Sequence, residues 1–289
     1  MLLNKLSFFL LITLFACSFI EYKLPPTETY TDYSVDKIPY LLNEPDTIFK
    51  LPWMLEEISG LTYVGDNTLV SVQDEEGIIY YIDALSGSVS EKKRFGSSGD
   101  YEGVELLKNS FWVMESNGAF HSFRVKPNSD IKSKKMTYGF TSKNDLEGLG
   151  QHNGKLLIAC KADGSVGPTE VKGKGIYKIA GNKPKLFIAI RQKELNSFVE
   201  NKKYFNEVKD FDPSAIAVHP STGDIYILSA DHVLVVYDKS LNLKEVAKLN
   251  KKLFIQPEGI TFSPEGTLYL TSEGNGSKGR LFVLSSLIK

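Results

Sequence analysis

The chain has 289 residues, and its 34 basic and 35 acidic side chains nearly cancel to a formal net charge of -1. A protein that binds nucleic acid is expected to carry a basic face, so this balance argues against a nucleic-acid partner. Hydrophobic residues make up 42% of the chain and aromatic residues 11%, which is enough to bury a sizeable core in one domain.

The first 17 residues predict an exported lipoprotein. A basic start is followed by an apolar run from Ser7 to Ala16, which is too short to span a membrane and is typical of a secretory signal. The end of this run, Leu14-Phe15-Ala16-Cys17, resembles the lipobox of bacterial lipoproteins. We therefore expect residues 1–16 to be removed and Cys17 to carry lipid, which would anchor the protein in the bacterial cell envelope, in the periplasm or at the cell surface. An ordinary signal peptide that contains a cysteine is the alternative.

Residues 17–45 are predicted to form a tether behind the lipidated Cys17. This stretch contains Pro25-Pro26 and several Thr and Tyr residues but no sustained hydrophobic period, so it should hold the folded part away from the membrane. Once Cys17 is lipidated, only Cys160 remains, and no intramolecular disulfide is possible. We expect Cys160 to be a buried apolar residue, and the folded domain to occupy residues 46–289.

One short motif occurs five times in this domain. Each copy consists of an acid or amide, an apolar residue or proline, Glu or Ser, Gly or Ala, and an apolar residue. The copies begin at Glu57, Asp100, Asp145, Asp212 and Gln256, and their small residues stand at positions 60, 103, 148, 215 and 259. Successive small residues are therefore 43, 45, 67 and 44 positions apart. A spacing in this range is typical of repeat architectures.

Each motif is followed by short runs rich in β-branched and aromatic residues. In the first unit these runs cover residues 67–72, 77–82 and 91–95, which together with the motif indicates four strands per unit. Units of about 45 residues with four strands are propeller blades, so the sequence predicts an all-β, five-bladed β-propeller. The last unit ends after three strands, and we expect an N-terminal strand within residues 46–53 to complete it and close the ring.

Two columns of polar residues are expected to meet at one mouth of the central channel. The first column lies in the motif strands and consists of Ser59, Glu102, Glu147, Ser214 and Glu258. The second column lies where the second strand of a unit ends and includes Asp74, Glu115, Lys161 and Glu273. In a blade the first strand begins and the second strand ends at the same face, so both columns should converge there. Crowded carboxylates repel one another, and this repulsion raises their pKa values.

A calcium ion would relieve this repulsion, because calcium binds several oxygen ligands in flexible sites. The metal ligands are predicted to come from Glu102, Glu147, Glu258, Asp74, Glu115 and Glu273, with Asp145 and Lys161 in contact with a further ligand. A water-filled channel, in which the acids pair with Lys161 and backbone amides, is the alternative.

The third unit is about 22 residues longer than its neighbours, and the excess falls near residues 165–172 and 192–209. The second stretch has the apolar spacing of a short amphipathic helix. Both stretches should emerge on the acidic face, either as binding elements or as decoration.

The motif copies Glu57-Ile58-Ser59-Gly60-Leu61, Asp145-Leu146-Glu147-Gly148-Leu149 and Gln256-Pro257-Glu258-Gly259-Ile260 together resemble the SdiA-regulated family of exported bacterial proteins. The resemblance covers residues 46–289. It implies a five-bladed β-propeller with a calcium site, and it implies no established reaction for named residues.

The leading functional hypothesis is a monomeric, calcium-containing module that binds a small molecule or an envelope protein at its acidic face. The alternative is a metal-dependent hydrolase of the lactonase or phytase kind, because calcium-bearing propellers host such enzymes. Its base would be His232 or Glu115, and Lys161 would contact a phosphate. A purely structural domain is the third hypothesis.

Overall fold

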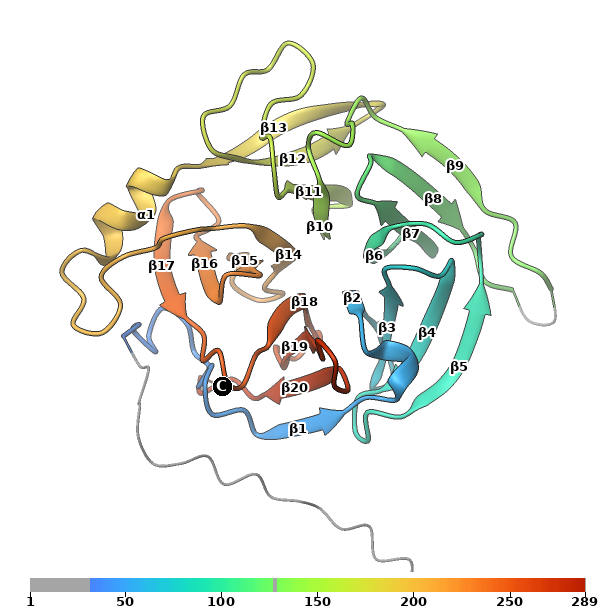
Figure 1. Ribbon diagram of the computed structural model, residues 1–289, viewed down its shortest axis with the longest axis horizontal. Helices are drawn as coiled ribbons and strands as arrows, with labels where there is room; N and C mark the ends of the chain where they lie inside the picture. The colour runs from blue at the N-terminus through green and yellow to red at the C-terminus, as the bar shows by residue number, and fades with distance from the viewer. Residues whose placement is uncertain (1–31, 127–128, 289) are drawn as a thin grey trace, which may run out of the picture.

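The protein is a five-bladed β-propeller, as predicted. The computed structural model describes residues 32–126 and 129–288. Within these residues, five antiparallel sheets of four strands each are arranged as a ring, with the first strand of every repeat innermost (Figure 1). No helix in the described part of the chain is long and apolar enough to cross a membrane. The predicted signal segment 1–16 and Cys17 lie outside the described residues.

The strands follow the repeat in chain order. Blade one contains β2 (Ile58–Gly65), β3 (Thr68–Gln73), β4 (Ile78–Asp83) and β5 (Val89–Arg94). Blade two contains β6 (Tyr101–Leu107), β7 (Ser110–Glu115), β8 (Ala119–Phe123) and β9 (Lys134–Thr137). Blade three contains β10 (Leu146–His152), β11 (Lys155–Cys160), β12 (Lys174–Ala180) and β13 (Lys183–Ile190). Blade four contains β14 (Pro213–Val218), β15 (Ile225–Ser229), β16 (Val233–Tyr237) and β17 (Leu243–Lys248).

Blade five joins the two ends of the chain. It contains β18 (Gln256–Phe262), β19 (Leu268–Glu273) and β20 (Arg280–Leu284), and its fourth strand is β1 (Thr47–Lys50). In the antiparallel ladder Thr47 pairs with Val283 and Lys50 with Arg280. The predicted ring closure is therefore confirmed, and it leaves no open edge on the last blade.

The small motif residues allow the blades to approach one another at the axis. A Cβ atom on Gly60 would lie 2.6 Å from the Cα of Gly103, and a Cβ on Gly103 would lie 2.4 Å from the Cβ of Leu149. Both distances are too short for non-bonded carbon atoms, so a larger residue would force adjacent blades apart. Outside this contact, apolar side chains of neighbouring sheets pack together, and the buried, free Cys160 is one of them.

The folded part of the chain begins earlier than predicted. Tyr33, Ile38, Tyr40 and Leu42 are buried in the apolar core shared by blades four and five. The Tyr40 hydroxyl donates a hydrogen bond of 2.7 Å to the carbonyl oxygen of Gly266. The predicted tether of residues 17–45 is therefore too long at its C-terminal end, because these side chains gain more from burial than from exposure to water.

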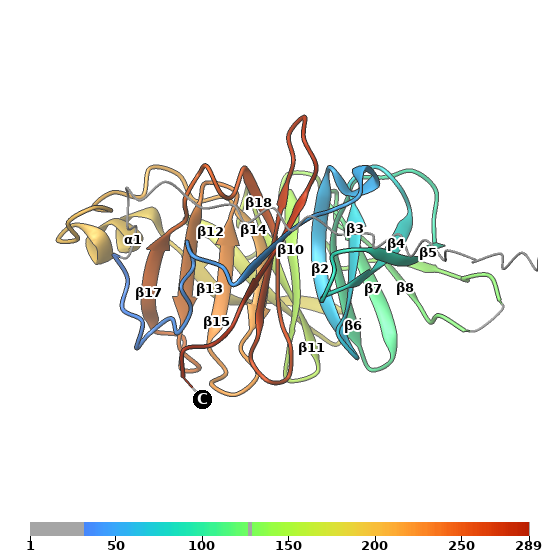
Figure 2. The same cartoon turned by 90° about the horizontal axis from the view of Figure 1, so that it is seen from below.

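In every blade the innermost strand begins, and the second strand ends, at the same face of the ring. We call it the upper face, since it points upward in Figure 2. The β11–β12 loop and the segment between β13 and β14, which includes α1 (Gln192–Val199), lie on this face. The 3-10 turn η1 (Trp53–Leu55), which precedes β2, also lies there.

Candidate axial binding site

A β-bulge precedes the small motif residue in every innermost strand. The register skips one residue between Tyr101 and Gly103, between Leu146 and Gly148, and between Pro257 and Gly259. Corresponding irregularities occur in β2 and β14. The skipped residues are Glu102, Glu147 and Glu258 in the three blades that carry a glutamate. A bulge leaves its residue unpaired and redirects the side chain, and here it brings three carboxylates from three blades to the axis.

The side chains of this group interact with one another. The carboxyl of Glu102 interacts electrostatically with that of Glu147, and the carboxyl of Glu258 with those of Glu147 and Glu273. Lys161 donates a hydrogen bond of 2.9 Å from Nζ to Oε1 of Glu147. We call Glu102, Glu147, Lys161 and Glu258 the axial cluster. Its members come from β6, β10, β18 and the end of β11, so the structure brings together residues that are far apart in sequence.

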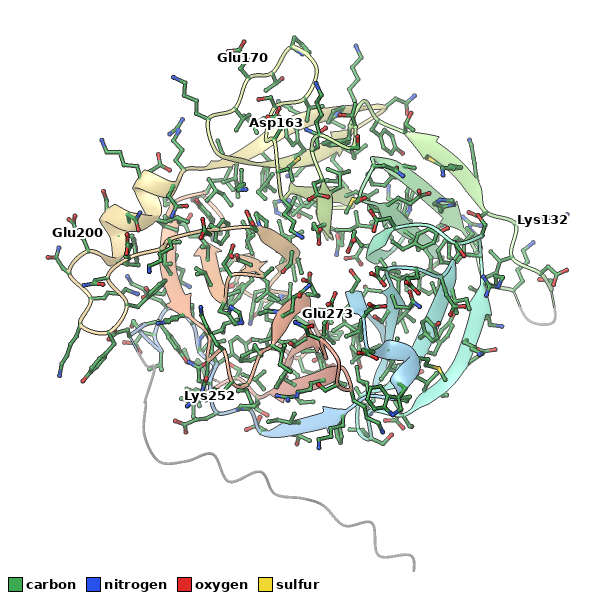
Figure 3. All side chains as sticks on the ribbon, viewed as in Figure 1. Lys132, Asp163, Glu170, Glu200, Lys252 and Glu273 are labelled. Atoms are coloured by element: carbon green, nitrogen blue, oxygen red, sulfur yellow. The ribbon has the colours of Figure 1, made fainter. Side chains whose placement is uncertain are left out.

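The second predicted column is also present at the upper face, with one correction. The strand pairings align Asp74, Ser116, Lys161, Ala230 and Glu273, each of which directly follows or ends the second strand of its blade. Asp74 and Glu273 interact with each other, and Glu273 lies beside the axis in Figure 3. Further acids, Glu57, Glu75, Asp100 and Asp145, surround them.

Glu115 does not belong to this column and is wrong as a predicted metal ligand. It pairs with Tyr101 in the ladder, one position before Ser116, and alternation along the strand turns its side chain to the other face of the sheet. Its Oε1 accepts hydrogen bonds from Nε2 of His121 at 2.6 Å and from Nζ of Lys135 at 2.7 Å. These bonds lower the pKa of Glu115, against the effect of burial, so this carboxylate already has its cationic partner.

Burial is the main cause of the unusual protonation of the axial acids. It raises the pKa of Glu102 to about 9, with a further contribution from the neighbouring Glu147. It raises the pKa of Glu147 and of Glu273 to about 7, although Lys161 partly offsets the effect on Glu147. For Glu258, burial and the carboxylates of Glu147 and Glu273 raise the pKa well above its ordinary value. Glu102 and Glu258 therefore retain their protons at neutral pH, whereas Glu147 and Glu273 change protonation state near neutral pH.

Two carboxylate oxygens at this end of the axis lack a partner. Oε2 of Glu258 and Oδ1 of Asp74 are buried and make no hydrogen bond within the described residues. The other oxygen of Glu258 accepts a hydrogen bond of 3.1 Å from Nε2 of Gln256. Buried polar atoms are rarely left unsatisfied, so these oxygens fit a site that accepts a cation.

The acids are not arranged as a preformed metal site. Among the described residues, no three His, Cys, Asp or Glu side chains lie close enough together to hold a metal ion as they stand. One reason is that the ammonium group of Lys161 occupies an oxygen of Glu147. Burial alone would lower the pKa of Lys161, but Glu147 and Glu258 raise it, so this lysine remains charged as an internal counterion.

The family comparison covers nearly the whole ring. The sequence model of the SdiA-regulated family matches residues 47–277. The chain belongs to the SdiA-regulated family. No curated protein sequence matches this SdiA-regulated protein significantly.

Solved structures with a similar fold include enzymes. The glutaminyl cyclase of Myxococcus xanthus has a TM-score of 0.57 and 14% sequence identity, over 84% of this chain and 95% of that chain. A luciferin-regenerating enzyme has a TM-score of 0.52 and 11% identity, over 85% of this chain and 96% of that chain. At this level of identity the similarity concerns the fold of the SdiA-regulated protein and not its chemistry.

The two bases considered for a hydrolase are both engaged elsewhere. Glu115 binds His121 and Lys135, as described above. His232 is bonded through Nε2 to the backbone carbonyl oxygens of Phe254 and Ile255, at 2.8 and 3.1 Å. Neither side chain therefore approaches the axial cluster as a free base, which weakens the hydrolase hypothesis for this SdiA-regulated protein.

The two insertions of the third unit lie at the rim of the upper face. Residues 192–199 form the predicted helix α1, whose Leu195 and Val199 are buried against blades three and four. A cavity of about 570 Å³ is lined by Ser165, Glu170, Val171, Lys172 and Arg191. Figure 3 places Glu170 at the periphery and Glu273 at the centre, so this cavity is separate from the axial cluster.

Proposed function

We propose that this SdiA-regulated propeller is a calcium-holding binding module, anchored in the cell envelope through a lipid on Cys17. The observation that carries the proposal is the unpartnered, buried Oε2 of Glu258, which lies within a group of carboxyls whose pKa values are raised by burial and by one another. Calcium accepts irregular sets of carboxylate and water oxygens, which suits side chains gathered from several blades.

The ion would be held by Glu258 and Glu147, with Glu102, Glu273 and Asp74 in support. The bulges hold the glutamates at the axis, and Lys161 would have to leave Oε1 of Glu147 for that oxygen to serve as a ligand. Bound calcium would neutralise the carboxylates and offer open coordination positions to the oxygen atoms of a ligand. Asp145 and the released Lys161 would then face that ligand.

Thermal denaturation of the chelated protein with added calcium tests this function. A ligand that binds only the folded state stabilises it by about 2.7 kcal/mol at a hundredfold excess over its dissociation constant. We expect calcium to raise the melting temperature, and Glu258→Gln and Glu147→Gln to weaken the increase. Glu91→Gln is the matched control, because Glu91 is an exposed residue of β5 that pairs with Lys93.

A melting temperature that does not respond to calcium in the parent protein would contradict the proposal. An equal response in Glu258→Gln would show that the ion binds elsewhere. Magnesium provides the specificity control, since it requires a smaller and more regular set of ligands.

A further inference from the structure

Beside the axial cluster, the upper face exposes two large apolar side chains. Trp53 and Met54, in the turn η1, are 59% and 46% exposed. The turn is held against the β19–β20 loop, residues 274–279, because the backbone amide of Gly274 donates a hydrogen bond of 2.8 Å to the carbonyl oxygen of Glu56. The loop projects beyond its neighbours at the top of Figure 2. We call Trp53 and Met54 the apolar wall; the loop beside them is polar and carries Lys278.

The wall is continuous with the acids. Glu57 lies two residues after η1, and Glu273 directly precedes the loop. These two residues interact electrostatically. One surface therefore combines exposed aromatic and thioether groups with carboxylates. Trp53 already has an ammonium group near its ring, since Nζ of Lys278 lies 6.0 Å from the ring centroid. A tryptophan face in this environment suits a lysine or arginine side chain.

The charge on this surface is large and concentrated. Nine acids interact with one another here, and Lys161 is the lysine within their network. They are Glu57, Asp74, Glu75, Asp100, Glu102, Asp145, Glu147, Glu258 and Glu273. Their formal charge with Lys161 is -8, whereas the remainder of the chain has 33 basic and 26 acidic residues. Glu102 and Glu258 retain their protons at neutral pH, but the other acids still outnumber Lys161, and Glu57, Glu75 and Asp100 are exposed, so the surface selects a cationic partner.

We propose that the upper face binds a basic polypeptide segment, with lysine or arginine side chains over the acids and apolar side chains on Trp53 and Met54. The acids come from four blades, so a single amine can reach only a few of them. An extended chain with several cationic side chains can reach them together. This inference names the partner of the binding module proposed above and shares its acids, but it does not require the calcium ion.

A labelled peptide of repeating Lys-Leu-Gly, measured by fluorescence anisotropy, tests the proposal, with a Glu-Leu-Gly peptide as the charge control. We expect the basic peptide alone to bind, and its affinity to fall at high salt. Trp53→Ala should weaken binding about tenfold, as is typical of an aromatic anchor. Asp100→Asn should also weaken it. Leu85→Ala is the matched apolar control, because Leu85 is 70% exposed and lies in the β4–β5 loop on the opposite face.

The outcomes separate this inference from the calcium site. Peptide binding that depends on Trp53 in chelated protein, without a thermal response to calcium, would support the inference and contradict the calcium proposal. A normal calcium response without peptide binding would overturn the inference alone. If spermine bound as tightly as the peptide and Trp53→Ala had no effect, the site would be one for small polycations, and the polypeptide proposal would be wrong. Trp53→Ala must also retain the parent melting temperature, which its exposed position makes us expect.

Discussion

At the scale of the residue, the axial glutamates are costly to ionise. Each is surrounded by protein, so it loses the hydration that stabilises a carboxylate, and each has at least one further acid nearby. Lys161 relieves this cost for Glu147 only in part, and the hydroxyl of Ser59 donates a hydrogen bond of 2.8 Å to Oε2 of Glu102. Binding of the proposed cation at this site would therefore displace protons.

This exchange predicts how stability depends on pH. The folded-state pKa values of Asp74, Glu147, Glu273 and Glu102 are raised to about 6, 7, 7 and 9, so the folded state binds more protons than the unfolded state above the ordinary carboxyl range. Their contribution to stability is complete below that range and is lost as the pH rises through 6 to 9. The melting temperature of chelated protein should fall over this interval.

Glu102→Gln should reduce the loss of folding stability with rising pH by more than about 1 kcal/mol, since glutamine does not titrate. Calcium should stabilise most at the alkaline end of the interval, where it no longer competes with protons. Differential scanning calorimetry between pH 5 and pH 9 measures both effects. A pKa shift of one unit corresponds to about 1.4 kcal/mol of stability. A melting temperature that rises with pH in the chelated protein would contradict this account.

The error at Glu115 shows why residue positions at a site are harder to predict than the fold. The sequence offers Glu115 and Ser116 at the end of the same strand, and a shift of one position turns a side chain to the opposite face. The choice depends on the bulge at Glu102 and on His121 and Lys135 in the two outer strands, none of which has a signal in the motif itself. Glu102, Glu147 and Glu258 were predictable because they occupy one repeat position.

At the scale of the element, the segment before β1 is as much a part of the propeller as a blade strand. Tyr40 packs against His219, Tyr226 and Phe262, with ring centroids 6.0 to 6.3 Å apart. The carboxylate of the buried Glu245 accepts a hydrogen bond of 3.1 Å from the backbone amide of Ser34. These contacts lie along an irregular chain, and they could not be predicted because this segment has no hydrophobic period of two or 3.6 residues.

Two N-terminal truncations measure the contribution of this segment to stability separately from that of the closing strand β1. A chain that begins at residue 46 loses the buried side chains of Tyr33, Ile38, Tyr40 and Leu42, each worth about 1.5 to 3 kcal/mol when fully buried. We expect its melting temperature to fall clearly, and that of a chain beginning at residue 54 to fall further, because β1 is then missing and blade five has an open edge.

A chain that begins at residue 32 is the control and should melt like the parent protein. If the chain beginning at residue 46 melts at the same temperature as this control, the buried segment contributes nothing to stability. If the chain beginning at residue 54 does so, β1 is dispensable for ring closure.

At the scale of the whole molecule, the fold was predictable because five repeats agree with one another. A glycine or alanine at one fixed position, followed by short strands at similar spacing, is consistent with blades around an axis and with few other arrangements. Because the last repeat is one strand short, β1 could be predicted as the strand that completes blade five by pairing with β20. The apolar wall had no such support, since Trp53 and Met54 occur once and outside the repeat.

Attachment to the envelope is a prediction for the whole molecule and rests on Cys17. Metabolic labelling with a fatty acid should label the parent protein, and Cys17→Ser should abolish the label and either leave the precursor uncleaved or release the protein from the membrane fraction. Cys160→Ser is the matched control, because Cys160 is buried and free and should not affect labelling. Normal processing and membrane association of Cys17→Ser would refute the lipid anchor.

The pairing of β1 with β20 also sets the order in which the molecule can be completed. The strand β1, the first among the described residues, leaves the ribosome long before its partner, since Thr47 pairs with Val283. Blades one to four can form from local contacts, but the closing contact has a very large sequence separation and is expected to form slowly. Until then the protein is an open ribbon with an unpaired strand at each end, vulnerable to mispairing and to proteases. Ring closure is thus a late folding step, because it requires β20 near the C-terminal end of the domain.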